Sequence, residues 1–158
     1  MINAAIVGIG RWGQYLVTSV QGSSEHIKFT AGVTRTKSKA EAFCSEQGID
    51  LRDDYAELLN DPNINAIVLA TPHTQHEEQI VAAAKAGKHV FTEKPFTLDR
   101  PSAERAVAAC KEAGVALALG HNRRFMENTV ALKAMIEADE LGTLMHIDGN
   151  QSSDLNVA

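Results

Sequence analysis

Apolar and polar positions along the chain fall into two alternating kinds of run. Short continuous apolar runs, such as residues 66–70, are typical of strands buried on both faces of a parallel sheet. The predicted strands cover residues 4–7, 27–34, 66–70, 89–92 and 115–119, and the predicted helices cover 14–20, 38–47, 55–60, 74–86, 99–113 and 127–138. Strand and helix alternate five times, which predicts an α/β fold: a doubly wound parallel sheet with helices on both faces.

Two of the predicted helices begin with a capping-box pattern. In this pattern a hydroxyl side chain and a glutamate three residues later satisfy free backbone N–H groups. Ser38 with Glu41 predicts one such start, and Thr74 with Glu77 predicts the other. These starts help to separate the helices from the strands and turns that precede them.

Three glycines follow the first predicted strand at the G-x-G-x-x-G spacing. Gly8 allows a sharp turn, Gly10 lets a pyrophosphate approach the backbone, and Gly13 lets the next helix lie close to the strand. The start of that helix also offers free N–H groups to phosphates. We therefore predict a dinucleotide-binding loop, and the alternative is a glycine-rich turn without a ligand. The expected cofactor-binding residues of this loop are Gly8, Ile9, Gly10, Arg11, Trp12 and Gly13.

The end of the second predicted strand lacks the acidic residue that usually binds the ribose 2′-hydroxyl of NAD. Thr34, Arg35 and Lys37 stand there instead, in an otherwise acidic chain. A guanidinium forms a forked pair with a phosphate, which a carboxylate would repel. The pattern therefore favours NADP(H) over NAD(H) as the cofactor. The alternative is an ordinary solvated loop with long basic side chains.

Polar residues also follow the later predicted strands. They are the pairs Thr71–Pro72, Glu93–Lys94 and His121–Asn122. Because ligands of open α/β sheets bind beyond the carboxyl ends of the strands, we expect these residues to gather near the glycine loop.

Composition excludes several other classes of function. The 158 residues carry a formal net charge of −5 and no long basic run, so nucleic acid and anionic membranes are poor partners. No apolar run approaches the roughly 20 residues of a membrane span. Cys44 and Cys110 lack metal or redox spacing, which suits buried thiols in a reducing cytoplasm, and the histidines show no ligand spacing, so no metal site is expected.

The end of the chain departs from the alternating pattern. Residues 143–149 read as a strand with Met145 and Ile147 on one face, which suits a half-exposed antiparallel sheet. A single strand cannot bury its face alone, so we expect a second, incomplete domain here. The expected domains are residues 1–122, which bind the nucleotide, and 123–158, which supply a linking helix and a first strand.

Four stretches together resemble the Gfo/Idh/MocA oxidoreductases, the family of glucose–fructose oxidoreductase and inositol dehydrogenase. They are Gly8-x-Gly10-x-x-Gly13, Ala70-Thr71-Pro72 with His76, Ala86-Gly87-Lys88-His89-Val90 leading to Glu93-Lys94-Pro95, and Gly120-His121-Asn122-Arg123-Arg124-Phe125. The resemblance covers nearly the whole chain. It implies a Rossmann domain followed by an α/β substrate domain, a homo-oligomer in the full-length form, and NAD(P)-dependent hydride transfer at a sugar or polyol hydroxyl or carbonyl.

The resemblance also implies roles for individual residues. Lys94 contacts the substrate hydroxyl and assists proton transfer, with Glu93 beside it in the same catalytic pair, and both adjoin the cofactor. A cis bond precedes Pro95. The residues expected beside the nicotinamide half of the cofactor are Thr71, Pro72, His76, Asn122 and Arg123. The family's remaining catalytic residues come from the second domain and have no counterpart in this chain.

Simpler interpretations stay open at several of these positions. From spacing alone, Glu93 and Lys94 form an exposed ion pair that contributes little. In these interpretations His76 simply lies in the first turn of a helix, and Trp12 has only a packing role. Two other functions also remain: a module that binds NADP(H) without turnover, and a Rossmann domain that binds another nucleotide.

Overall fold

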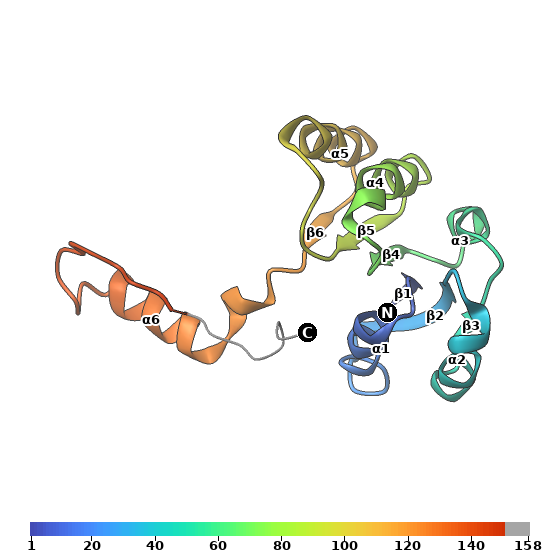
Figure 1. The fold of residues 1–158 in the computed structure, drawn as a ribbon, viewed down its shortest axis with the longest axis horizontal. Helices are drawn as coiled ribbons and strands as arrows, with labels where there is room; N and C mark the ends of the chain where they lie inside the picture. Colours follow the sequence, from blue (N-terminus) through green and yellow to red (C-terminus); the bar gives the residue numbers. More distant parts are fainter. Residues whose placement is uncertain (151–158) are drawn as a thin grey trace. The chain divides into compact units, whose positions relative to one another are not determined.

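A computed structural model describes residues 1–150 of the chain. The chain divides into two compact units, one of residues 1–120 and another that begins at His121. The first unit holds a sheet with helices around it, and the second holds a 3₁₀ turn and an α-helix (Figure 1).

The first unit is built on a six-stranded, entirely parallel sheet with the strand order β3-β2-β1-β4-β5-β6. The strands are β1 (Ile2–Val7), β2 (Ile27–Val33), β3 (Asp50–Leu51), β4 (Ala66–Leu69), β5 (His89–Thr92) and β6 (Leu117–Leu119). The helices are α1 (Arg11–Thr18), α2 (Glu41–Gln47), α3 (Tyr55–Asn60), α4 (His76–Lys85) and α5 (Arg100–Ala113). Short 3₁₀ turns, η1 (Lys37–Lys39) and η2 (His73–Gln75), precede α2 and α4. This order confirms the predicted doubly wound fold.

Two apolar cores lie on opposite faces of this sheet. Alternate residues of β1 enter different cores, because successive side chains of a strand point to opposite faces. Ala4 and Ile6 pack with Val17 of α1 and Cys44 of α2. The residues facing the other way pack with α3, α4 and α5: Ala5, Val7, Leu58, Ile80, Ala83, Ala106 and Cys110. Helices therefore cover both faces, as Figure 1 shows.

The strand order places the point of topological reversal at β1. Its neighbour β2 lies on one side and β4 on the other, and the chain crosses over between them. In open α/β sheets this is where the crevice for a ligand forms, beyond the carboxyl ends of the strands. The residues that follow β1, β2 and β4 are consequently brought together.

Both predicted capping boxes are wrong. Residues 37–39 form the 3₁₀ turn η1, and α2 begins after Ala40 without a side-chain cap. Residues 73–75 likewise form η2, and α4 begins after Gln75 without a side-chain cap. In both places the 3₁₀ turn satisfies part of the free backbone, so the hydroxyl is not needed there.

Other predicted boundaries agree with the structure within a few residues. Helix α5 is capped by Asp99, whose side chain accepts a hydrogen bond from the Ser102 backbone N–H, and it ends at the left-handed Gly114. Helix α1 begins at Arg11, three residues before the predicted start, directly after the glycine turn.

The second unit contains the 3₁₀ turn η3 (Asn122–Phe125) and helix α6 (Glu127–Glu137). The predicted helix is confirmed. The predicted strand at residues 143–149 is wrong, because these residues form no strand in the structure. Among the described residues of this unit no other strand is present to pair with them, and an unpaired strand leaves its backbone groups without partners.

Candidate functional site

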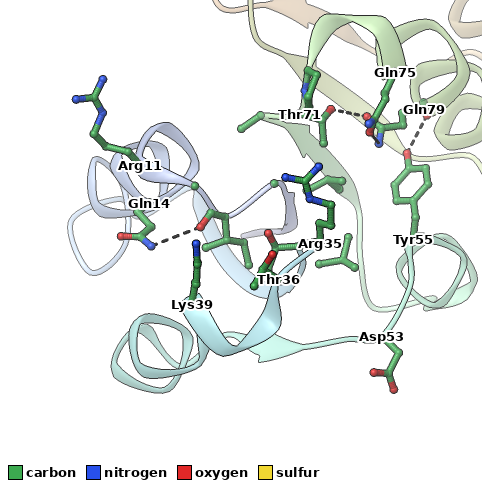
Figure 2. A pocket seen from close by; sticks show the side chains of 18 residues that line it. Arg11, Gln14, Arg35, Thr36, Lys39, Asp53, Tyr55, Thr71, Gln75 and Gln79 are labelled. Atoms are coloured by element: carbon green, nitrogen blue, oxygen red, sulfur yellow. Dashed lines mark hydrogen bonds between the residues drawn. The ribbon is translucent and has the colours of Figure 1, made fainter. Parts of the chain in front are cut away.

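A cavity of about 740 Å³ lies beyond the carboxyl ends of β1, β2 and β4. Residues 7–11 and Gln14 line it from the loop and helix after β1, and residues 33–36 with Lys39 line it from the segment after β2. Residues 70–72, Gln75 and Gln79 close the β4 side (Figure 2). Residues far apart in the sequence thus form one polar site at the predicted edge of the sheet.

Each glycine of the loop has a different steric requirement. Gly8 adopts a φ of 92°, and a Cβ there would lie 2.7 Å from the Ala70 carbonyl oxygen. At Gly13 a Cβ would lie 2.0 Å from the Gly8 carbonyl oxygen, so only glycine allows α1 to approach the turn this closely. At Gly10 a Cβ would meet nothing within 4 Å. Of these three, Gly10 lies where an absent side chain leaves open space.

The start of α1 suits an anionic ligand. Gly10 is the residue before the helix, and the first turn contains no acidic side chain. The first N–H groups of a helix have no partner within it and carry partial positive charge. Arg11 and Gln14 line the cavity from this helix. The Gln14 side-chain amide donates to the Ile9 carbonyl oxygen at 3.4 Å.

The segment after β2 brings Thr34, Arg35 and Thr36 to the cavity. In Figure 2 the Arg35 side chain extends toward the side of the cavity that holds Thr71 and Gln75. Lys39 also lines the cavity, although the sequence singled out Lys37.

Lys37 itself is not among the residues that line the cavity. Its ammonium pairs with the carboxylate of Asp53, which comes from the segment after β3. Asp53 lies at the cavity rim, where its side chain points away from the other labelled residues in Figure 2. The pair leaves Arg35 and Lys39 as the basic groups of this segment that face the cavity.

A chain of polar groups forms the β4 side of the cavity. The Thr71 hydroxyl donates to Oε1 of Gln79 at 2.6 Å, and Nε2 of Gln79 donates to Oε1 of Gln75 at 3.3 Å. The Tyr55 hydroxyl donates to the Gln79 carbonyl oxygen at 2.8 Å. The sequence patterns did not single out Gln75, Gln79 or Tyr55 as site residues. The spacing of the two glutamines by four residues was the available signal, since residues i and i+4 share a helix face.

His76 is buried and is not among the residues that line the cavity. Its Nε2 lies 3.0 Å from the Thr71 carbonyl oxygen. Its Nδ1 lies 3.0 Å from the Pro95 carbonyl oxygen and 3.1 Å from that of Phe96. The ring therefore contacts the backbone on two sides, and only 1% of the residue is exposed.

Glu93 and Lys94 follow β5 and lie outside the set of residues that line this cavity. Glu93 is buried, and its carboxylate accepts a hydrogen bond from the Lys94 backbone N–H at 3.2 Å. Oxygen Oε1 of Glu93 lies so close to Gly120 that a Cβ there would be 2.7 Å away. Lys94 is exposed, and the bond between it and Pro95 is cis, as expected.

The remaining predicted site residues lie elsewhere. Trp12 and Gly13 are not among the cavity-lining residues, and the Trp12 ring stacks on Tyr15 with ring centroids 5.0 Å apart. Asn122 and Arg123 belong to η3 of the second unit. Within residues 1–150 no three or more His, Cys, Asp or Glu side chains gather as a metal ion would require. No helix in the same part of the chain is both long and apolar enough to span a membrane.

Comparison with known proteins agrees with this geometry. The scyllo-inositol 2-dehydrogenase (NAD⁺) of Bacillus subtilis is 36% identical over 153 residues, which are 94% of this chain and 44% of that protein. The chain thus spans less than half the length of this curated relative.

Solved structures show the same similarity. The scyllo-inositol dehydrogenase of Lactobacillus casei with bound NAD(H) and scyllo-inositol superposes with a TM-score of 0.84 and 28% identity, over 90% of this chain and 42% of that one. A 3-ketoreductase from Actinomadura kijaniata in complex with NADP gives a TM-score of 0.79 and 27% identity, over 87% and 43% of the two chains.

The family model described as "Oxidoreductase family, NAD-binding Rossmann fold" matches residues 2–121. This match covers the whole sheet, the glycine loop and the Glu93–Lys94 segment. The chain belongs to the Gfo/Idh/MocA family of oxidoreductases.

Proposed function

We propose that this chain is the NADP(H)-binding portion of an oxidoreductase that transfers hydride between the cofactor and a sugar or polyol. The cofactor assignment rests on the residues that line the cavity after β2. Thr34, Arg35 and Thr36 line it, and no acid stands at the end of that strand. A 2′-phosphate would meet a guanidinium and hydroxyl groups there.

The charges around this segment favour a ribose 2′-phosphate, as in NADP(H), over the free 2′-hydroxyl of NAD(H). Asp53 is the acid at the rim, and Lys37 already neutralises it. Arg35 and Lys39 remain to pair with a ligand. A carboxylate free to accept from a ribose 2′-hydroxyl, as NAD-specific sites present, is missing from the end of β2.

The residues present fit a dinucleotide. The start of α1 and the open space at Gly10 would hold the pyrophosphate, and Arg35 with Lys39 would hold the 2′-phosphate. When bound, the nicotinamide group donates or accepts the hydride. We assign its neighbourhood to the Thr71–Pro72 turn.

The protein's own chemistry in this proposal falls to Lys94. Its ammonium, exposed after β5, would give a proton to the substrate oxygen during reduction or meet the negative charge that develops there. During oxidation the neutral amine would take the proton of the hydroxyl group. Glu93 would hold the Lys94 backbone in place through the hydrogen bond to its N–H.

The substrate class is proposed from the similarity to inositol dehydrogenases. Substrate selection would also need groups outside the described cavity, because neither Glu93 nor Lys94 lines it. We further propose that residues 1–122 bind the nucleotide, that 123–158 begin a substrate domain, and that the full-length protein forms a homo-oligomer.

A second candidate function is a module that binds NADP(H) without turnover. The separation of Lys94 from the cavity-lining residues favours it. Cofactor binding without oxidation of any polyol, measured with the longest available gene product, would support the module over the enzyme.

The Arg35→Asp variant tests the cofactor assignment. A charge-assisted hydrogen bond contributes about 1.5–3 kcal/mol, so we expect NADPH affinity to fall about 10- to 100-fold. NADH affinity should change little, because NADH has no 2′-phosphate. Calorimetric titration with each cofactor measures both effects, and equal losses would contradict the assignment.

Matched variants control for general electrostatics. Arg35→Gln and Lys28→Gln each remove one positive charge, from the segment after β2 and from β2 itself. We expect only Arg35→Gln to lower NADPH affinity strongly, because Lys28 is exposed and does not line the cavity. Similar losses for both variants would show that these charges act only as a diffuse positive field.

A further inference from the structure

His76 connects two backbone segments that the proposed function uses for different purposes. One is the Thr71–Pro72 turn after β4, which lines the cofactor cavity. The other is the Pro95–Phe96 segment directly after Lys94. The ring contacts carbonyl oxygens of both segments at 3.0 to 3.1 Å. Within residues 1–150, no other side chain hydrogen-bonds to both of these segments.

The environment of the ring makes these contacts costly to lose. His76 is 1% exposed, so water cannot replace the imidazole as a partner for the three carbonyl oxygens. Both ring nitrogens lie beside carbonyl oxygens, and the nitrogen that carries the proton donates to its neighbour, so the tautomer decides which segment accepts. An apolar ring of similar size would fill the same space but would leave buried carbonyl groups unpaired.

Its location at the start of α4 strengthens the connection. Helix α4 begins at His76 and carries Gln79 one turn later, on the cavity wall with Thr71. The same helix packs on β5 and α5. His76 is thus fixed by a packed helix at its backbone and by two loops at its ring.

We propose that His76 is a positioning residue that couples the cofactor-binding turn at Thr71 to the segment that carries Lys94. This proposal rests on the proposed function, in which Thr71 adjoins the cofactor and Lys94 meets the substrate. Binding at the turn is transmitted through the imidazole to the carbonyl groups of Pro95 and Phe96. His76 itself touches neither cofactor nor substrate.

Amide NMR of the ¹⁵N-labelled chain tests this coupling. In the wild type, NADPH should shift the amide signals of Thr71, Lys94 and Phe96. In His76→Phe, which keeps an aromatic ring but removes both ring nitrogens, Thr71 should still respond while the response of Lys94 and Phe96 is lost. A role in packing alone predicts that all three responses survive in His76→Phe, and that result would overturn the proposal.

A neighbouring histidine supplies the matched control. His73 is exposed in η2, three residues earlier, so His73→Phe should keep the wild-type response at all three amides. If His76→Phe does not fold, His76→Asn replaces it. Asparagine is too short to reach both segments at once, so it should also lose the response at Phe96. Retention of that response in the folded Asn variant would likewise overturn the coupling.

Failure of the coupling and failure of the cofactor assignment give different NMR results. If NADPH moves no amide of the glycine loop or of Thr71, the cofactor assignment fails. The positioning role is then decided in the free protein, where His76→Phe should shift the Lys94 and Phe96 amides and His73→Phe should not. Unchanged Lys94 and Phe96 signals in free His76→Phe would refute the role.

Discussion

Gly10 and Gly13 differ in what a methyl group at each position would meet. At Gly10 the φ is −80° and nothing lies within 4 Å, so alanine fits the folded chain. At Gly13 the added carbon would lie 2.0 Å from a backbone oxygen of Gly8. Substitution by alanine should therefore affect cofactor binding at Gly10 and folding at Gly13.

We expect Gly10→Ala to keep the free energy of unfolding within about 1 kcal/mol of the wild type while abolishing NADPH binding. Gly13→Ala should lower the free energy of unfolding by about 1–3 kcal/mol or more, because backbone must shift to relieve the overlap. Urea denaturation and calorimetric titration of both variants measure the two effects. Wild-type affinity in Gly10→Ala would show that no ligand approaches the loop there.

The sequence predicted which segment is basic but not which lysine faces the cavity. Lys37 and Lys39 lie two residues apart and look equivalent in the sequence. The Lys37 ammonium pairs with Asp53, which lies sixteen residues later in the segment after β3, and so does not face the cavity. Such a contact depends on the tertiary fold, so residue types and spacing alone could not reveal it. His76 was likewise predicted at the cofactor, whereas its ring lies buried against backbone carbonyl groups.

At the scale of elements, α4 and α5 are joined by an ion pair that should make stability depend on pH. The Arg105 guanidinium donates two hydrogen bonds to the Glu77 carboxylate, from Nε at 2.5 Å and from Nη2 at 3.0 Å, and they hold the pKa of that carboxyl below its ordinary value. Because this pKa is lower in the folded chain than in the unfolded chain, the ionised carboxylate stabilises the fold at pH values above its ordinary pKa. That contribution disappears as the pH falls through the lowered pKa.

We therefore expect Arg105→Gln to lower the melting temperature at pH 7 and to differ less from the wild type at pH 3. Arg100→Gln is the control, because Arg100 pairs with Glu104 within α5 and does not link two helices. Its effect should be smaller at both pH values. Thermal unfolding followed by circular dichroism measures the differences, and an Arg105→Gln effect that is equal at both pH values would refute the assigned role.

A continuous apolar run and a capped helix predicted their elements well, whereas very short strands and turns escaped prediction. The apolar run of β4 and the capped, glycine-terminated α5 were predicted closely. Strand β3 has only two residues, which is too few for any period to show. The two capping boxes failed because 3₁₀ turns occupy residues 37–39 and 73–75, and a four-residue pattern does not reveal that competition.

At the scale of the whole molecule, the alternation of strands and helices predicted the doubly wound sheet of the first unit. The strand order brings the ends of β1, β2 and β4 together, as the polar residues after them suggested. The predicted strand at 143–149 failed for a different reason. A strand forms only against a neighbour, and its alternating pattern does not show whether that neighbour is present.

We propose that the cavity binds NADP(H) in preference to NAD(H). Titrating the wild-type chain with NADPH and separately with NADH, by calorimetry and by Trp12 fluorescence, tests it most directly. We expect NADPH to bind more tightly by about 10-fold or more, since a guanidinium–phosphate pair contributes about 1.5–3 kcal/mol. Equal affinities, or tighter binding of NADH, would contradict it.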